Sequence, residues 1–385
     1  MLRFGSLVVS PFIAFAASVG LTQDAGAAST SRAMAVTAGE YHTCALTKAG
    51  TVACWGINNN GQLGDGTDNS TVAPVAVQGL TGVVAIVAGH YHTCALTKSG
   101  SVKCWGANNH GQIGDDSTTD RLTPTDVSGL GSGVLAIGAG EYHTCAVTAA
   151  GAAMCWGQNQ NGQLGNGTLD DSHLPGQVTG LSSGIAAIAG GVNHTCAVTS
   201  AGQVKCWGDN SNGQLGNGTR TNERSPRPVL VRGIRGATAV ATGQQHSCAI
   251  AGGRVKCWGF DSDGQLGDGG NTEQDSPVAT RALGTDVAAI DAGLWHNCAL
   301  LADGRVKCWG FNSDGQIGNG TGFGNNAHTP VLVKTIRGAT AIATGSRHGC
   351  AIIKAGNLRC WGQNDGQIGD GTTVERDTPV DVTGF

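Results

Sequence analysis

Short apolar runs, separated by segments rich in Gly, Asn and Thr, recur along the whole chain. The first unit shows their order: an apolar run at 35–38, HTCAL at 42–46, VACWG at 52–56 and a Pro-Val-x-Val segment at 74–77. Short runs of this kind bounded by Gly and Asn are typical of β-strands and turns, and no stretch has sustained helical periodicity. Each unit therefore predicts four short strands.

This unit occurs seven times, and its first cysteine stands at 44, 94, 145, 196, 248, 298 and 350. A fixed period of this length indicates a repeat architecture, and four strands repeated seven times are typical of a β-propeller. The predicted fold is all-β, a seven-bladed β-propeller with four antiparallel strands per blade over residues 34–385. The repeats run approximately over 34–80, 81–131, 132–182, 183–234, 235–285, 286–336 and 337–385, and no second domain is expected.

Fourteen cysteines form seven pairs, six of them ten residues apart and one nine residues apart. If each pair is opposed on a hairpin, the first unit leaves a loop at 48–50 that ends in Gly50, as a three-residue hairpin loop prefers. The nine-residue pair leaves Gly252-Gly253, a tight two-residue loop. Opposed residues have Cα atoms about 4.5 Å apart, within disulfide range, and no C-x-x-C spacing indicates a metal site. We predict one disulfide per blade: Cys44–Cys54, Cys94–Cys104, Cys145–Cys155, Cys196–Cys206, Cys248–Cys257, Cys298–Cys308 and Cys350–Cys360.

The N-terminal segment has the features of a secretory signal peptide. Arg3 precedes an apolar run at 7–21, and Ala25-Gly26-Ala27 forms an A-x-A cleavage site. The predicted signal peptide covers 1–27, and a short segment at 28–33 precedes the propeller. No other stretch is long and apolar enough to span a bilayer. We expect export to an extracellular, periplasmic or cell-surface location, where disulfides persist.

The composition and the loop sequences argue against several classes of partner and cofactor. Charged residues are 13% of the chain, the formal net charge is −4 and no run of Lys and Arg occurs, so nucleic acid is not an expected partner. The Gly-rich GQ(L/I)G loops lack the Lys and the following helix of a phosphate site. The loops with Asp and Asn lack the distal Glu of a calcium loop. No cofactor and no metal are predicted.

The repeated motif HTCAL…VxCWGxNxxGQ(L/I)G, over roughly 34–385, resembles the regulator of chromosome condensation repeat family. The resemblance implies a seven-bladed propeller. It also implies diverse activities, namely guanine-nucleotide exchange on a small nuclear GTPase, inhibition of secreted β-lactamases and ultraviolet-B sensing, which share protein binding through loops on the propeller faces. The expected export matches the compartment of the secreted inhibitors. The fold by itself does not name the function.

Residues that recur in every unit are expected to be structural. The glutamines of the GQ(L/I)G loops, such as Gln62, are expected to bind backbone groups of an adjacent blade. The histidines two residues before each first cysteine, such as His42, are expected to be hydrogen-bonded at a strand start. One tryptophan follows each second cysteine, as packing between blades requires: Trp55, Trp105, Trp156, Trp207, Trp258, Trp309 and Trp361.

Binding residues should instead differ between units, as they do in the turn between the first two strands. In a propeller, these turns ring the central channel on one face. The turns carry all three tyrosines of the chain and the one tryptophan outside the Cys-Trp-Gly motif. Exposed aromatic clusters on a loop-built face suit a binding surface, while half-buried packing is an equal alternative for the tyrosines. The candidate binding residues are Glu40, Tyr41, His90, Tyr91, Glu141, Tyr142, Asn193, Gln245, Leu294, Trp295 and Arg347.

These patterns predict a monomeric, exported protein-binding module, without catalytic residues, that inhibits or scaffolds an extracellular protein. A glycan-binding propeller is the alternative, because aromatic platforms stack on sugar rings and Glu40 and Glu141 could accept hydroxyl groups. A nuclear nucleotide-exchange factor is less favoured because the chain is expected to be exported and disulfide-bonded. An enzyme is less favoured because no acid–base pair breaks the repeat symmetry. Two longer loops, at 219–227 and 321–329, are either extensions of the interface or solvent loops.

Overall fold

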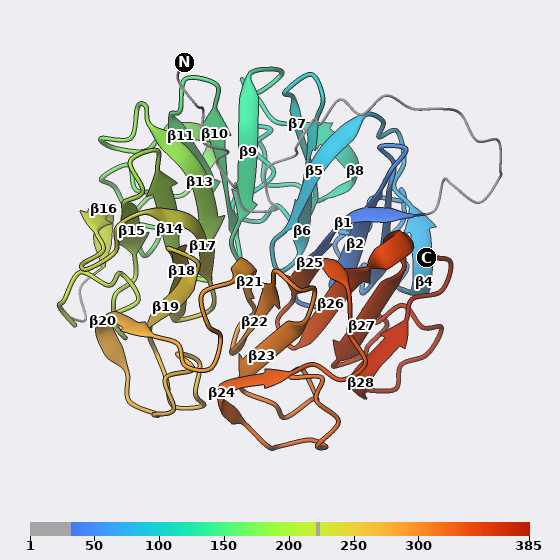
Figure 1. Ribbon diagram of the computed structural model, residues 1–385. Helices are drawn as coiled ribbons and strands as arrows, with labels where there is room; N and C mark the ends of the chain where they lie inside the picture. The colour runs from blue at the N-terminus through green and yellow to red at the C-terminus, as the bar shows by residue number, and fades with distance from the viewer. Residues whose placement is uncertain (1–31, 221–223) are drawn as a thin grey trace, which may run out of the picture.

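The computed structural model describes residues 32–220 and 224–385, which form seven four-stranded antiparallel sheets around one axis (Figure 1). The order of strands in each sheet follows the chain, as in β1-β2-β3-β4, so each described blade takes all four strands from one repeat. The predicted all-β, seven-bladed fold is confirmed. The signal peptide predicted at 1–27 lies outside the described residues.

Each blade runs from an innermost strand at the axis to an outermost strand at the perimeter. The innermost strands are β1 (Ala33–Ala38), β5 (Val83–Ala88), β9 (Val134–Ala139), β13 (Ile185–Gly190), β17 (Ala237–Thr242), β21 (Val287–Ala292) and β25 (Ala339–Thr344). The second strands are β2 (His42–Thr47), β6 (His92–Thr97), β10 (His143–Thr148), β14 (His194–Thr199), β18 (His246–Ala251), β22 (His296–Leu301) and β26 (His348–Ile353).

The third strands, which carry the Cys-Trp-Gly motif, are β3 (Val52–Gly56), β7 (Val102–Gly106), β11 (Ala153–Gly157), β15 (Val204–Gly208), β19 (Arg254–Gly259), β23 (Val306–Gly310) and β27 (Leu358–Gly362). The outermost strands are β4 (Thr71–Ala76), β8 (Arg121–Asp126), β12 (Ser172–Gln177), β16 (Ser225–Leu230), β20 (Gln274–Ala279), β24 (Ala327–Leu332) and β28 (Arg376–Asp381). A short 3-10 turn, η1 (Lys354–Gly356), lies between β26 and β27.

A disulfide lies within the hairpin of second and third strands in every blade. All seven predicted pairs are bonded, with Cα–Cα distances of 4.0 or 4.1 Å. In the fifth blade Cys248 opposes Cys257 and the strands close on Gly252 and Gly253, whose φ angles are 59° and 73°. The residue missing from this repeat is therefore missing from the turn, and the register is the predicted one.

Repeat residues tie each blade to the next through hydrogen bonds. Between the first two blades, the Thr93 hydroxyl donates to the main-chain carbonyl of Gln62 (3.0 Å), and the Trp105 indole N–H donates to the same carbonyl (2.9 Å). His42 Nε2 lies 2.9 Å from Thr93 Oγ1. Because the hydroxyl proton is already used, the imidazole must donate through a proton on Nε2. Burial lowers the pKa of His42 to about 3, so the ring that donates is neutral. His42, Thr93 and Trp105 are fully buried.

The prediction for the glutamine side chains was wrong. The Gln62 side chain accepts a hydrogen bond from the Asn60 N–H (3.0 Å) within its own loop, and the main-chain carbonyl makes the bonds to the adjacent blade. The loop turns twice in succession, with Gly61 N bonded to Asn58 O and Gly64 N to Gly61 O. Such tight turns leave N–H groups that a nearby side-chain acceptor satisfies.

The same contacts close the ring between the last and first blades. His348 Nε2 lies 2.9 Å from Thr43 Oγ1, and the Trp55 indole donates to the Gln367 carbonyl (2.9 Å). The two ends of the propeller are thus in direct contact. The interface of the sixth and seventh blades has two hydrogen bonds fewer, because Gly349 replaces the threonine. The Trp361 indole still donates to the Gln316 carbonyl (2.9 Å), but the His296 ring has no hydrogen-bond partner among the described residues.

The propeller has two faces, which we define by their connections. The upper face consists of the turns between first and second strands, such as 39–41, and the loops between third and fourth strands, such as 57–70. The lower face consists of the hairpin loops between second and third strands, such as 48–51, and the connections between blades, such as 77–82.

Candidate binding face

The turns that carry most of the candidate residues form a ring around the axis on the upper face. Neighbouring turns are joined through the main chain: Glu40 N donates to His90 O (3.2 Å), His90 N to Glu141 O (3.4 Å) and Glu141 N to Gly191 O (3.2 Å). Ser346 N donates to Gly39 O (3.2 Å) and continues the ring between the last and first blades. Residues about 51 positions apart in sequence therefore lie side by side here.

The three tyrosines form a continuous aromatic arc. The ring centroids of Tyr41 and Tyr91 are 6.4 Å apart, and those of Tyr91 and Tyr142 are 6.0 Å apart in a stacked arrangement. His110, from the following loop of the second blade, extends the arc with its ring 5.2 Å from that of Tyr142. The tyrosines are half-buried. Burial, and next the Glu40 carboxylate, raise the pKa of Tyr91 well above its usual value, so the arc stays uncharged across the physiological range.

His90 lies between two carboxylates beside this arc. Its Nδ1 is 3.4 Å from Glu40 and 3.5 Å from Glu141. Burial by itself would lower the pKa of His90, but Glu141 and Glu40 outweigh it and raise the pKa to about 9. Burial also opposes ionisation of Glu40, yet its contacts with His90 and Tyr91 lower its pKa overall. The three side chains thus form an ion triad with one net negative charge at neutral pH.

Replacing His90 by Gln removes the cation and leaves two carboxylates facing each other. We expect the free energy of unfolding to fall by about 2 kcal/mol at pH 6. A raised folded-state pKa gives stability that is complete below the unfolded value of 6.5 and is lost as the pH rises through about 9. The difference from the wild type should therefore shrink between these pH values in urea titrations. A Gln245→Asn control should show no such trend, and a deficit in the His90 variant that is equal at both pH values would contradict the ion triad.

A second aromatic group lies on the opposite part of the ring. The Trp295 and Phe260 rings are 5.5 Å apart, edge to face. The Arg347 guanidinium lies 6.0 Å from the centre of the Phe311 ring and 3.4 Å from Asp314. The sequence analysis missed Phe260 and Phe311. Both follow a Cys-Trp-Gly motif, at a position that other repeats fill with smaller or polar residues, so the same search for broken symmetry would have found them.

The remaining candidates separate the two aromatic groups. Asn193 and Gln245 occupy the turns of the fourth and fifth blades, where their carbonyl groups accept hydrogen bonds from Asp209 N (2.8 Å) and Phe260 N (2.9 Å). Leu294 is half-buried beside Trp295, and its carbonyl accepts from Gln244 N (3.1 Å). The ring therefore presents an arc of tyrosines, a polar sector and a mixed group of Trp, Phe and Arg.

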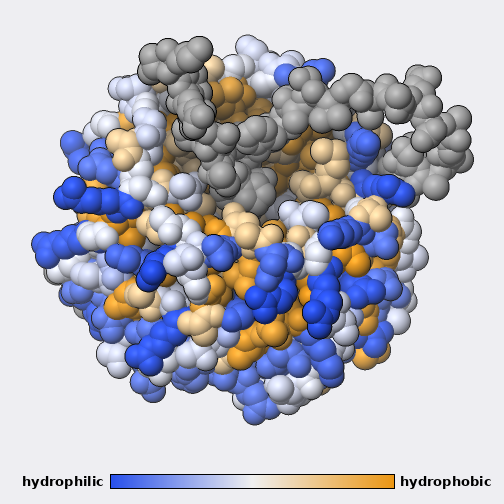
Figure 2. Space-filling model, viewed as in Figure 1, coloured by the Kyte–Doolittle hydropathy of each residue, from blue (hydrophilic) through white to orange (hydrophobic). Residues whose placement is uncertain are grey.

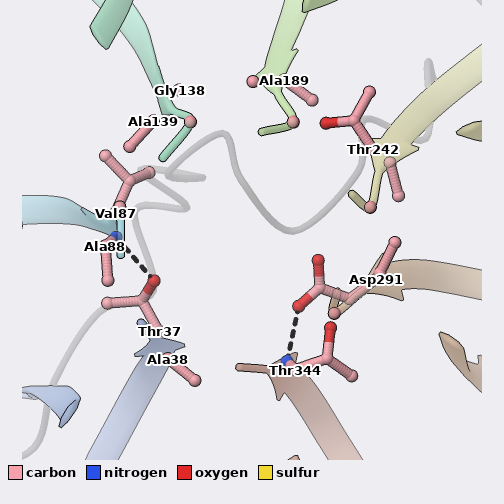
Figure 3. A pocket seen from close by; sticks show the side chains of 18 of the residues that line it. Thr37, Ala38, Val87, Ala88, Gly138, Ala139, Ala189, Thr242, Asp291 and Thr344 are labelled. Carbon is pink, nitrogen blue, oxygen red and sulfur yellow. Dashed lines mark hydrogen bonds between the residues drawn. The ribbon is translucent and has the colours of Figure 1, made fainter. Parts of the chain in front are cut away.

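A cavity of about 130 Å³ lies on the axis between the seven innermost strands (Figure 3). Figure 2 shows apolar side chains around the hollow at the middle of the molecule. Asp291 faces the cavity and accepts a hydrogen bond from Thr344 N (2.7 Å), as Thr37 accepts one from Ala88 N (2.9 Å). Burial raises the pKa of Asp291 to about 6. Because Asp291 has the same place and bond as Thr37, we assign it to packing of the blades.

No group of three or more His, Cys, Asp or Glu side chains in 32–220 and 224–385 is arranged to hold a metal ion. The repeated histidines each face a neighbouring blade, so they do not converge. Over the same residues, no helix is long and apolar enough to cross a bilayer.

The fold and this face define a class of protein, a disulfide-bonded repeat propeller with a loop-built surface that departs from the repeat symmetry. The chain belongs to the RCC1-like family. The RCC1-like domain profile matches residues 18–284, and regulator of chromosome condensation repeats match 287–316, 339–367 and 303–352. The resemblance seen in the repeated motif is thereby confirmed.

Two relatives differ in how much of their length corresponds to this chain. The ultraviolet-B receptor UVR8 of Arabidopsis thaliana is 32% identical over 356 residues, which cover 90% of this chain and 81% of the receptor. The E3 ubiquitin-protein ligase HERC2 of Homo sapiens is 32% identical over 259 residues, which cover 65% of this chain and 5% of the ligase. The match to the ligase therefore concerns a small part of a much longer protein.

Solved structures share the fold at low sequence identity. Yeast RCC1 (Prp20), solved bound to Kap60, has a TM-score of 0.76 at 20% identity, and the match covers 95% of this chain and 90% of that one. Human WBSCR16 has a TM-score of 0.73 at 22% identity, with 87% and 94% covered. The receptor kinase CR4 ectodomain of Physcomitrella patens has a TM-score of 0.54 at 22% identity, with 85% and 72% covered.

Proposed function

We propose that the upper face binds a protein partner and that the chain works as a binding module. The observation that carries this proposal is the concentration of symmetry-breaking aromatic side chains in one ring of turns. Tyr, Trp and Arg are the residues that most often dominate binding energy at protein interfaces. Here Tyr41, Tyr91, Tyr142, Trp295 and Arg347 share one face, and each is half-buried, so it keeps accessible area while its orientation is held by neighbours.

The charge of this face favours a basic partner. The upper turns and loops, with the strand ends that adjoin them, carry twenty-one of the twenty-five carboxylates among the described residues but six of the twenty-two Lys and Arg side chains. Carboxylates around an aromatic arc complement Lys and Arg side chains, which also pack over aromatic rings. Binding should therefore be faster at low ionic strength and should weaken as salt screens the field.

Related structures support protein binding as a use of this fold. Yeast RCC1 (Prp20) was solved bound to Kap60, and a second study of Prp20p from Saccharomyces cerevisiae concerns its binding to Gsp1p and histones. The seven disulfides support an oxidising compartment. Within that setting, we propose that the chain is exported and inhibits or scaffolds an extracellular protein.

Affinity capture with matched variants tests the face. We expect a variant with Tyr41, Tyr91, Tyr142 and Trp295 replaced by Ala to lose captured protein, with an affinity at least roughly 30-fold weaker, because interface anchors of this type each contribute about 2 kcal/mol or more. A control with Ala at four exposed apolar positions of the outer perimeter, Leu122, Leu169, Leu174 and Val374, should capture as the wild type does.

The alternatives give different results in this experiment. If the perimeter control loses the partner and the aromatic variant retains it, the outer loops of the upper face form the interface, and the proposal that its ring of aromatic turns carries the binding is wrong. If the wild-type bait retains no protein but binds envelope glycans through the tyrosines, the upper face is a carbohydrate site instead.

A further inference from the structure

The lower face has the opposite charge to the upper face. Its hairpins, connections and adjoining strand ends carry sixteen of the twenty-two Lys and Arg side chains in the described residues and four of the twenty-five carboxylates. The formal net charge of −4 for the whole chain conceals this separation. A field of one sign over one end of a rigid molecule orients it toward partners of the other sign.

Most of the basic residues come from corresponding positions in the fourth to seventh blades. The residue before the second cysteine is Lys205, Lys256, Lys307 and Arg359 in these blades. The Lys256 ammonium donates to the carbonyl of Gly233 in the preceding connection (3.2 Å), which places this row at the lower rim.

The connections and hairpins of the same blades add exposed cations. Arg235 and Arg337 occupy corresponding places in two of these connections, and both are exposed. Arg254 and Arg305 occupy the hairpins. We call the Lys and Arg residues of the lower face in the fourth to seventh blades the basic arc.

Few carboxylates neutralise the basic arc. In the lower face of these four blades the acidic residues are Asp286, Asp303 and Asp381. Asp303 pairs with Arg305 (2.6 Å) and Asp381 with Arg359 (2.7 Å). The charged ends of Arg232, Arg281 and Lys334 lie beside Gly218, Gly269 and Gly320 of the upper loops. The exposed side chains of Arg235, Arg254 and Arg337 make no hydrogen bond or ion pair with the described residues, so their charges are free to face a partner.

Exposed aliphatic side chains accompany the cations. Leu230 and Leu332 end the outermost strands β16 and β24, are 50% and 48% exposed, and each stands two residues before a cation of the basic arc. Met34 and Leu135, near the lower ends of innermost strands, are 58% and 56% exposed. Among the described residues, four of the nine exposed large apolar side chains thus lie at the lower end of the propeller.

The loops of the lower face also have nearly constant lengths. Its hairpin loops have four residues in six blades and two in the fifth, whereas the loops on the upper face vary in length. The connections between blades have six or seven residues throughout. The exposed side chains of successive blades therefore end at similar heights and can contact one plane together.

From these features we propose that the lower face docks onto a bilayer that contains anionic phospholipids. Each Lys or Arg near such a surface contributes about 1 kcal/mol of attraction, and aliphatic side chains among the cations enter the interface between headgroups and acyl chains. This orientation leaves the upper face pointing away from the bilayer, toward a protein partner. The proposal does not depend on the identity of that partner.

Two other occupants match the charge but not the apolar side chains. The acidic upper face of a second copy would complement the basic arc, but such a head-to-tail contact does not close and would produce open stacks. A soluble polyanion would bind the cations and leave Leu230 and Leu332 in water. The bilayer is the occupant that uses both kinds of side chain.

Vesicle sedimentation with the full chain tests the proposal. The vesicles are phosphatidylcholine alone, or phosphatidylcholine with about a third phosphatidylglycerol. We expect binding to the second kind at low salt, and a partition coefficient roughly 100-fold lower after Arg235→Gln, Arg254→Gln and Arg337→Gln are combined. The control combines Arg121→Gln, Arg220→Gln and Arg376→Gln on the upper half, which changes the net charge equally. All variants share the same N-terminal residues, so differences between them report on the lower face.

Each outcome supports or overturns the proposal. The proposal is supported if the lower-face triple variant loses vesicle binding and the upper-half triple variant does not. It also predicts that a variant with Leu230→Ser and Leu332→Ser binds vesicles more weakly but binds dextran sulfate as the wild type does. Equal losses in both triples, no preference for phosphatidylglycerol, or binding to dextran sulfate but not to vesicles would overturn it. The proposal would also be overturned if the wild type formed salt-sensitive stacks in analytical ultracentrifugation, the lower-face triple variant did not, and neither of the two bound vesicles.

Discussion

Lowering the pH from about 7 to about 5 is expected to unfold the propeller with uptake of several protons, because seven histidines are neutral and fully buried in the folded state. Burial lowers the pKa of six of them to about 3 and that of His246 to about 4. A depressed folded-state pKa gives stability that is complete above the unfolded value of 6.5 and is lost as the pH falls.

The size of this effect follows from the shifts. At pH 5 each neutral, buried histidine lowers the free energy of unfolding by about 2 kcal/mol. Asp261 and Asp291, whose pKa values burial raises to about 7 and about 6, take up their protons more readily in the folded state and offset a few kcal/mol. The net loss is on the order of 10 kcal/mol, comparable to the whole stability of a domain.

Urea unfolding between pH 7.5 and pH 5 measures this loss, since its pH slope gives the number of protons taken up. Replacing His42 and His194 by Asn keeps a side-chain N–H donor for the neighbouring hydroxyl but removes two titrating groups. This variant should be less stable near neutral pH and should take up about two protons fewer. If the wild type took up fewer than two protons on unfolding, the conclusion that these histidines are neutral and buried in the folded state would be wrong.

Reducing all seven disulfides is expected to prevent refolding. Each closes a loop of about ten residues and is worth about 2–3 kcal/mol in the chain-entropy view. Even with incomplete additivity, the sum exceeds the stability typical of a domain. The cysteines are no more than 1% exposed, so the folded protein should resist reductant until denaturant opens it.

Tryptophan fluorescence after denaturation, reduction and dilution measures this effect, because seven of the eight tryptophans are fully buried in the fold. The reduced and alkylated chain should keep the spectrum of solvent-exposed tryptophan, while the oxidised chain should regain the buried spectrum. Removing one bond with Cys196→Ala and Cys206→Ala should cost about 2 kcal/mol and leave the ring folded. Cooperative refolding of the fully reduced chain would show that the disulfides are dispensable.

Much of the fold could be predicted because every repeat contains the same apolar runs, turn glycines and cysteine pair. The hairpin at Gly252-Gly253 shows this well: a one-residue deletion could be placed in the turn from cysteine spacing alone, and the register confirms it. The function of the Gln62 side chain could not be predicted, since it depends on how tightly its own loop turns. The local spacing of the motif contains no information about that geometry.

The candidate face could be predicted only in part. Broken symmetry in one turn located Tyr41, Tyr91, Tyr142 and Trp295. The contacts of His90 with Glu40 and Glu141 join residues about 50 positions apart, and a single sequence does not show which of two adjoining turn positions face each other. The separation of charge between the two faces depends on which connections share an end of the ring, so it becomes visible only once the strands are placed.

Hydroxyl-radical footprinting of the chain with and without its captured partner tests most directly whether the upper face is the protein-binding surface. Trp295 is half-buried while the seven Cys-Trp-Gly tryptophans are fully buried, so oxidation of tryptophan in the folded chain reports mainly on this face. The account predicts that the partner protects Trp295, Tyr91 and Tyr142 while Met34 on the lower face stays reactive. Protection of Met34, or of Phe323 in the perimeter loop, with the upper aromatic residues still reactive, would contradict it.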